Sequence, residues 1–196
     1  MKKILITASA ALILAACGSQ KEATASSTSD AKTVATVEMT KPEARMATMV
    51  NGNLQGVASL KDFQSEPFNS WFNPRYEEYT PDDAVVADLK SQMKDVEVRA
   101  YMGTWCGDSK RETPKFFKLL DAVGYDQDDL TMITVDRSKS EPADLVNGYD
   151  VNRVPTFIFY RDGEELGRFV EYPRETLEKD ILKIVSGQDY KHSYEN

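Results

Sequence analysis

Histidine and cysteine are scarce in this sequence of 196 residues, and basic residues are fewer than acidic ones. It has one histidine, His192, and two cysteines, so a zinc site of the Cys/His kind and a Cys/His catalytic dyad lack the side chains that they need. Lysine and arginine number 24 against 32 aspartate and glutamate residues, which gives a formal net charge of −8. We therefore expect no metal ion, no cofactor and no broad electrostatic binding to nucleic acid.

The N-terminus lacks an apolar run long enough to span a bilayer. Two lysines are followed by an apolar run from Ile4 to Ala16, which has the length of a signal-peptide core. The run ends in Leu-Ala-Ala-Cys, with Cys17 as the last residue, and this pattern resembles the lipobox of bacterial lipoproteins. The resemblance implies that residues 1–16 are a cleaved signal peptide and that Cys17 carries a lipid. The alternative is that Cys17 is an ordinary buried cysteine.

Residues 17–45 are predicted to be a lipidated cysteine followed by a flexible tether, because serine, threonine and alanine dominate there. The lipoprotein resemblance implies a cell-envelope protein that is anchored to a membrane through Cys17. Gly18 and Ser19 replace the aspartate that retains many lipoproteins at the inner membrane, which implies the outer membrane, facing the periplasm, if the source is Gram-negative. A lipidated Cys17 has no free thiol, so we expect Cys106 to form no intramolecular disulfide.

Alternating helix and strand signals predict one folded domain over residues 80–190. Thr80 is expected to cap the first helix and Pro81 to be its first residue, and alternating apolar residues at 96–102 predict the next strand. The order becomes helix, strand, helix, strand, helix, strand, strand, helix. This order predicts an α/β fold in which helices flank a mixed central sheet. The expected later elements are helices from residue 106 to a stop at Gly124, at 143–146 and at 177–185, and strands at 130–135, 156–160 and 165–170. Residues 191–196 are a short polar tail to which we assign no role.

Residues 46–79 form an N-terminal extension that is rich in aromatic side chains. One interpretation is a groove that binds a client peptide. The other is that the extension packs on the domain and buries its rings, as aromatic side chains usually do. The aromatic residues are Phe63, Phe68, Trp71, Phe72, Tyr76 and Tyr79.

One set of motifs indicates a candidate catalytic site. A Trp-Cys-Gly-Asp-Ser motif lies where the strand at 96–102 passes into a helix, and a proline follows within that helix. A Val-Pro-Thr element precedes a later strand, and an Asp-Gly turn joins the last two strands. The motif residues are Trp105, Cys106, Gly107, Asp108 and Ser109, followed by Pro114, by Val154, Pro155 and Thr156, and by Asp162 and Gly163.

These features in this order resemble the thioredoxin superfamily over about residues 81–187. The resemblance implies a thioredoxin-like fold in which Pro155 forms a cis peptide bond and lies against the reactive cysteine, Cys106. It also implies that the neighbours of Pro155 pair with the backbone of an extended client. The implied substrate-binding residues are Trp105, Gly107, Asp108, Arg153, Val154, Pro155 and Thr156.

The position of Cys106 favours a reactive thiol. A cysteine at a helix N-terminus faces unpaired amide hydrogens and the positive end of the helix dipole, and both favour the thiolate. Lys110 and Arg111 add positive charge, whereas Asp108 opposes it. Arg153 either lies near Cys106 and adds to this effect or is a solvated surface arginine.

Three positions depart from the family pattern. Ser109 replaces the second cysteine of the Cys-x-x-Cys motif, and serine cannot resolve a mixed disulfide. The buried acid of thioredoxins corresponds to Ala100. The Ser109 hydroxyl can nevertheless donate a hydrogen bond to the Cys106 thiolate. Glu171 stands where thioredoxins usually have a glycine, and it either lines the groove or faces the solvent.

The residues leave three functions open. The first is a membrane-anchored monothiol oxidoreductase or disulfide isomerase, with Cys106 as nucleophile and Ser109 as thiolate stabiliser; its partners are client thiols or disulfides and an external reductant. The second is a redox-inactive binding module that holds a partner protein or peptide near Trp105 and Pro155. The third is a thiol-based oxidant sensor.

Overall fold

The computed structural model describes residues 46–195, so the predicted signal peptide, Cys17 and the whole predicted tether up to residue 45 lie outside the described residues. The strands are β1 (Thr48–Val50), β2 (Asn53–Val57), β3 (Glu97–Met102), β4 (Leu130–Thr134), β5 (Thr156–Arg161) and β6 (Glu164–Val170). The helices are α1 (Leu60–Phe63), α2 (Asn69–Glu78), α3 (Asp83–Gln92), α4 (Gly107–Val123), α5 (Ala143–Val146) and α6 (Leu177–Val185), and a short 3₁₀ turn covers Gln127–Asp129.

The described strands form one mixed sheet in the order β1-β2-β4-β3-β5-β6. β3 and β4 are parallel, and the other neighbouring pairs are antiparallel. From α3 to α6 the elements follow the predicted order, and the α/β fold with a mixed central sheet is confirmed. The parallel pair β3 and β4 places the C-terminal end of β3, where the Trp-Cys-Gly motif begins, in the middle of the sheet.

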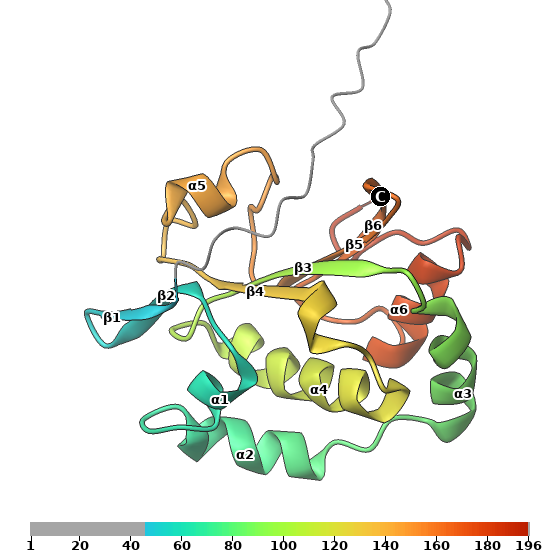
Figure 1. Cartoon of the computed structure of the whole chain (residues 1–196), viewed down its shortest axis with the longest axis horizontal. Coiled ribbons are helices and arrows are strands. Elements are labelled where there is room, and N and C mark those ends of the chain that lie inside the picture. The colour runs from blue at the N-terminus through green and yellow to red at the C-terminus, as the bar shows by residue number, and fades with distance from the viewer. Residues whose placement is uncertain (1–45, 196) are drawn as a thin grey trace, which may run out of the picture. The chain divides into compact units, whose positions relative to one another are not determined.

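Helix α5 lies on one face of the sheet and helices α1, α2 and α4 lie on the other (Figure 1), and a core lies beneath the helices on each face. The larger core packs α1, α2, α3, α4 and α6 against one face, with Phe116, Phe157 and Phe169 fully buried at its centre. The smaller core packs α5 against the other face, with Ile133 and Ile158 at its centre. Strand residues therefore alternate between two buried faces, as expected for a sheet that is covered on both sides.

Helix α4 begins and ends as the sequence predicts. Cys106 is its N-cap, and Gly124 ends it with a left-handed φ of 70°, the conformation that glycine adopts without steric cost. The expected cap of α3 is wrong: Asp82, not Thr80, is the N-cap, and its carboxylate accepts hydrogen bonds from the Ala84 and Val85 N–H groups. The Asp82 side chain reaches the free amides of the first turn, so the helix begins after Pro81.

Residues 46–79 contribute more regular structure than we expected. β1 and β2 form a hairpin with Asn51 and Gly52 at its turn, both with positive φ, and β2 pairs antiparallel with β4. An Asn-Gly pair is a strong hairpin signal that the sequence analysis did not use. The rings of Phe63 and Phe72 are fully buried and pack on Phe117 of α4.

Within residues 46–195, no helix is both long and apolar enough to cross a membrane.

Candidate functional site

Cys106 lies at the junction between β3 and α4. It is the N-cap of α4, with an extended backbone, and its carbonyl accepts the first helical hydrogen bond from the Lys110 N–H at 3.0 Å. The side chain is half-buried, and its sulfur is not in a disulfide. The thiol therefore stands at the end of a helix of 17 residues, where unpaired N–H groups and the helix dipole favour a negative charge.

The segment around Pro155 faces this thiol. The Cys106 Sγ donates to the Val154 carbonyl at 3.4 Å, and the Val154–Pro155 peptide bond is cis. The Thr156 hydroxyl donates to the Arg153 carbonyl at 2.8 Å, and the Glu171 N–H donates to the Pro155 carbonyl at 2.8 Å. Two segments that are 48 residues apart in the chain thus meet at the Cys106 sulfur.

Trp105 forms one side of the site. Its indole N–H donates to the Val135 carbonyl at 2.9 Å, and the Arg137 guanidinium lies 5.2 Å from the ring centre. A Cβ on Gly103 would come within 2.5 Å of the Trp105 ring, so only glycine leaves room for the ring there. Neither Gly103 nor Arg137 was expected beside Trp105. A glycine directly after a buried strand was a usable signal for Gly103, whereas no local pattern links residue 137 to residue 105.

Ser109 lies beneath the site rather than on its surface. It is fully buried, and its hydroxyl oxygen accepts a hydrogen bond from the Gly103 N–H at 3.2 Å. This contact ties the first turn of α4 to the loop that carries Trp105. The hydrogen bond from Ser109 to a Cys106 thiolate stays a prediction. Ala100, at the position of the family's buried acid, is fully buried in β3.

The charged residues that follow Cys106 mostly engage one another. Arg111 contacts the Asp108 carboxylate at 2.7 Å and the buried Glu112 carboxylate at 2.6 Å. Lys110 lies 5.8 Å from the ring centre of Trp71 in α2. Space around Gly107 is open, since no atom lies within 4 Å of a Cβ placed there. At the start of the helix, the Asp108 carboxylate is thus paired with Arg111, which Glu112 shares.

Arg153 and Glu171 form a cluster with the C-terminal tail. The Glu171 carboxylate accepts hydrogen bonds from the Arg153 guanidinium at 3.4 Å and from the Tyr194 hydroxyl. The Arg153 guanidinium lies 3.8 Å from the centre of the Tyr194 ring. The hydrogen bond to Glu171, together with burial and the negative charge, raises the pKa of Tyr194 to about 12.

Two sequence-based interpretations change as a result. The Glu171 side chain is only 17% exposed, so the interpretation that it faces the solvent is wrong. Its φ of 62° lies in the left-handed region, which glycine adopts without steric cost. The tail, to which the sequence analysis assigned no role, contributes Tyr194 to the surroundings of the site. No short-range pattern could have linked Tyr194 to Arg153.

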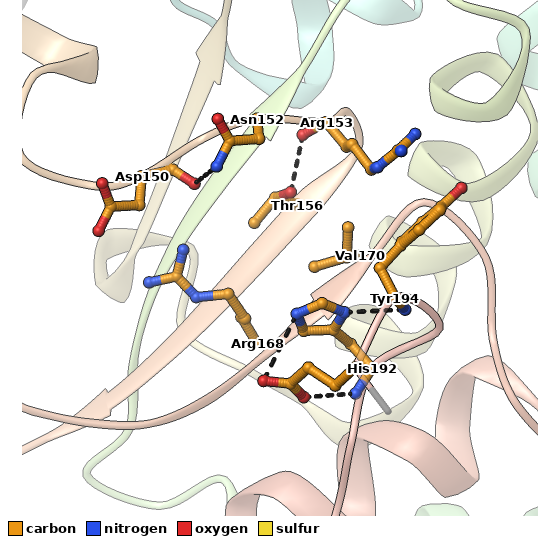
Figure 2. Close-up of a pocket in the computed structure, with 9 residues that line it drawn as sticks. Asp150, Asn152, Arg153, Thr156, Arg168, Val170, His192 and Tyr194 are labelled. Atoms are coloured by element: carbon orange, nitrogen blue, oxygen red, sulfur yellow. Dashed lines mark hydrogen bonds and ion pairs between the residues drawn. The ribbon is translucent and has the colours of Figure 1, made fainter.

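A cavity of about 350 Å³ lies beside this cluster. Figure 2 shows Arg153 and Tyr194 at one rim and the His192 ring below them. The His192 ring accepts a hydrogen bond from the Tyr194 N–H and lies 3.6 Å from the Glu195 carboxylate. Arg168 enters from β6, but it is held by the Glu165 carboxylate and by the Tyr149 carbonyl. The lining is completed by Asp150, Asn152, Thr156, Val170 and Glu195. Among residues 46–195, no three His, Cys, Asp or Glu side chains are grouped so that they could hold a metal ion.

Comparison with known proteins finds similarity over this part of the chain. The family model described as Thioredoxin matches residues 80–183. Thioredoxin from Gallus gallus is 32% identical over 99 residues, which cover 50% of this chain and 89% of that protein. Thioredoxin H9 from Arabidopsis thaliana is 28% identical over 88 residues, which cover 45% of this chain and 59% of that protein. The solved structure of Fasciola hepatica thioredoxin aligns with a TM-score of 0.35 and 22% identity, over 53% of this chain and 93% of that chain.

Proposed function

This chain belongs to the thioredoxin family, and from that premise we propose that it performs thiol-disulfide exchange with Cys106 as its single nucleophile. One observation carries the proposal: the half-buried Cys106 thiol stands at the N-terminus of α4 and within 3.4 Å of the Val154 carbonyl, beside a cis proline. A client disulfide that lies along Val154 would bring its sulfur to the helix N-terminus, where the attacking thiolate is most favoured.

The exchange balances without a cofactor. The Cys106 thiolate attacks one sulfur of a client disulfide, the client S–S bond breaks, and a mixed disulfide forms between Cys106 and the client. The other client sulfur leaves as a thiolate and takes up a proton from water. For isomerisation, another thiolate of the client attacks the client sulfur of the mixed disulfide, which releases Cys106 and leaves a new client disulfide. For net reduction, an external small-molecule thiolate attacks the Cys106 sulfur and releases the second client thiolate. A second external thiolate then frees Cys106, and the two small thiols leave as their own disulfide.

The residues around Cys106 would stabilise the thiolate and align the client. Ser109 would donate its hydroxyl hydrogen to the Cys106 thiolate while its oxygen keeps the bond from the Gly103 N–H. Val154 and Pro155 would align the client backbone, and Trp105, fixed through Val135, would form the opposite wall. Gly107 and Asp108 would border the groove on the helix side, and Thr156 would hold the Arg153 carbonyl in place.

We further propose that the protein works in the bacterial cell envelope, tethered to a membrane by a lipid on Cys17. The pattern of an apolar run that ends in Leu-Ala-Ala-Cys supports this location. The source of external thiols in that compartment would then decide whether reduction or isomerisation dominates. The anchor is tested by metabolic labelling with a radioactive fatty acid, which should label the wild-type chain and leave a Cys17→Ser variant unlabelled.

A binding module is the alternative function. The absence of a second thiol at Ser109 and of a carboxylate at Ala100 favours it, since both groups serve the release step in dithiol members of the family. In that case the groove beside Trp105 and Pro155 would hold a partner peptide without a covalent step.

A trapping experiment separates the two functions. The full-length chain, kept in detergent, is mixed with a peptide disulfide, and the products are followed by mass spectrometry. We expect the wild type to accumulate a mixed disulfide at Cys106, and the Cys106→Ser variant to form none. A Ser109→Cys variant should release the peptide and accumulate an internal disulfide instead. If the folded wild type formed no adduct under conditions in which the denatured chain forms one, the proposed exchange function would be contradicted.

A further inference from the structure

The surface beside Cys106 carries two exposed arginines whose guanidinium groups lie on aromatic rings. Arg137 lies on Trp105 at 5.2 Å, and Arg153 lies on Tyr194 at 3.8 Å. Trp105 is the residue directly before the thiol, and Arg153 directly precedes Val154, whose carbonyl contacts the sulfur. Arg153 therefore extends from the segment that faces the thiol, whereas Arg137 extends from the loop after β4 and reaches the site through the Trp105 ring.

Arg153 belongs to a cluster of side chains that contact one another. The Tyr194 hydroxyl and the Arg153 guanidinium share the Glu171 carboxylate, and Tyr172 packs edge-on against Tyr194 with ring centres 5.8 Å apart. The Ser193 hydroxyl donates to the Tyr172 carbonyl at 2.7 Å, which fastens the tail to the end of β6. This part of the tail follows the residues that match the family, 80–183, so it is a feature that the family match does not supply.

Side chains of this cluster are also exposed and can contact a partner. The Arg153 side chain is 47% exposed, and Tyr172 and Tyr194 are 43% and 40% exposed. A guanidinium has five N–H donors, and among the contacts of residues 46–195 Glu171 uses one of its terminal nitrogens. Tyrosine and arginine are also the residues that dominate binding energy in protein interfaces. The remaining donors, held flat by the ring beneath, fit the carboxylate of a bound partner.

Acidic groups near the two arginines are already engaged. Asp136, next to Arg137, accepts hydrogen bonds from the Ser138, Ser140 and Glu141 N–H groups. Glu171 is shared between Arg153 and Tyr194. The net charge of −8 belongs to the whole chain, and at physiological salt charges farther than about 8 Å contribute little. Short-range contacts with the two guanidinium groups would then decide which client residues are preferred.

We propose that Arg153, placed by Tyr194, and Arg137 form an interaction surface for an extended client segment that carries Asp or Glu side chains on both sides of its cysteine. The proposal rests on the function proposed above. The aromatic rings hold the guanidinium groups in place, so little side-chain freedom is lost when a carboxylate binds. Arg153 and Arg137 are thus specificity-determining residues, and Tyr194 is a positioning residue that acts through Arg153.

The test compares three peptide disulfides that are identical except for Glu, Gln or Lys on each side of the cysteine. Exchange with Cys106 of the full-length chain is timed by mass spectrometry. We expect the Glu peptide to react about three- to tenfold faster than the Gln peptide, the range for partly exposed charge pairs, and the Lys peptide to react slowest. Arg153→Gln and Arg137→Gln should each reduce the Glu preference, and the double variant should remove it.

Matched variants isolate the contribution of the tail. Tyr194→Ala removes the ring beneath Arg153 and should lower the ratio of the Glu-peptide rate to the Gln-peptide rate toward the ratio of Arg153→Gln. Lys94→Gln removes an exposed cation in the turn before β3 and should leave the preference unchanged. Equal rates for the Glu, Gln and Lys peptides, or a preference that survives in the double variant, would overturn the proposal and leave the exchange function standing.

A second measurement covers the case in which no peptide reacts. Peptides with serine in place of cysteine are then bound to the full-length Cys106→Ser chain, and affinity is read by calorimetry. Tighter binding of the Glu peptide, lost in the double variant, would support the acidic-client surface on a protein that does not perform exchange. Equal affinity for the Glu, Gln and Lys peptides would overturn it.

Discussion

Two segments flank the part of the chain that matches the thioredoxin family, and both are aromatic. Residues 46–79 bury their rings: Phe63 and Phe72 are stacked at 5.6 Å and fully buried against Phe117 of α4. Residues 188–195 instead hold Tyr194 half-exposed, with its hydroxyl on Glu171 and its ring under Arg153. The same class of side chain contributes core in the first segment and a polar surface beside the reactive thiol in the second.

The difference follows from what each segment meets. Helix α2 packs along α4, whose Phe117 offers an apolar surface, so buried ring area stabilises the fold. The tail meets Arg153 and Glu171, where contacts between exposed charged groups contribute at most about 1 kcal/mol. We therefore expect residues 46–79 to matter for stability and the tail to matter for recognition.

The largest effect should come from the first segment. Phe72→Ala leaves a cavity among Phe63, Tyr76 and Phe117, and it should lower the free energy of unfolding by about 3–5 kcal/mol. Denaturant unfolding of the full-length chain measures this loss. Phe72→Leu keeps most of the volume and should cost less than about 1.5 kcal/mol. A loss below about 1 kcal/mol for Phe72→Ala would mean that these rings do not form a true core.

A polar contact of the same segment should have a smaller effect. The Tyr79 hydroxyl donates to the buried Glu178 carboxylate of α6 at 2.5 Å. Tyr79→Phe removes the donor and leaves the carboxylate with one partner fewer, which should cost about 1–3 kcal/mol. The same unfolding assay applies, with Tyr172→Phe as a control at an exposed position. Equal stability of the Tyr79→Phe and Tyr172→Phe chains would contradict this role for the hydroxyl.

Substitutions in the tail should have little effect on the free energy of unfolding. Tyr194→Ala is expected to lower the free energy of unfolding by less than about 1 kcal/mol, because the ring is 40% exposed and its removal opens Arg153 and Glu171 to water. If unfolding showed a loss as large as that of Phe72→Ala, the tail would be part of the core and the contrast between the two segments would fail.

The smallest effect should appear in the alkaline range. A hydrogen bond from the Tyr194 hydroxyl to Glu171 raises the pKa of Tyr194 to about 12, against about 10 in the unfolded chain. A folded pKa above the unfolded value means that this stabilisation is complete below about pH 10 and is lost as the pH rises toward 12. The difference between wild-type and Tyr194→Phe phenolate absorbance isolates this titration. A Glu171→Gln variant should shift it back toward 10, and a wild-type midpoint near 10 would refute the contact.

Much of the fold was predictable from local patterns. Apolar alternation and the helix signals predicted the order of elements from α3 to α6, and Gly124 and the turn at residues 162–163 were expected where they occur. The α3 cap was misplaced because Thr80 and Asp82 are both good caps, and only the backbone shows which one reaches the first amides. The hairpin of β1 and β2 was missed although Asn51-Gly52 signals it.

The site was predictable only in part. The family motif placed Cys106 and Pro155 together correctly, because the register of β3 and β5 brings the ends of these strands side by side. Arg137 and Tyr194 could not be predicted, since each depends on a contact between segments that are far apart in the chain.

The sequence by itself determined the family, the position of Cys106 in the motif and the lack of a second thiol at Ser109, because these depend on residue identities at short spacings. Tertiary structure alone decided that Glu171 turns inward and that the tail returns to Arg153. Charge and ring contacts over long separations depend on where the sheet and the last helix direct the chain, and no local pattern encodes that path.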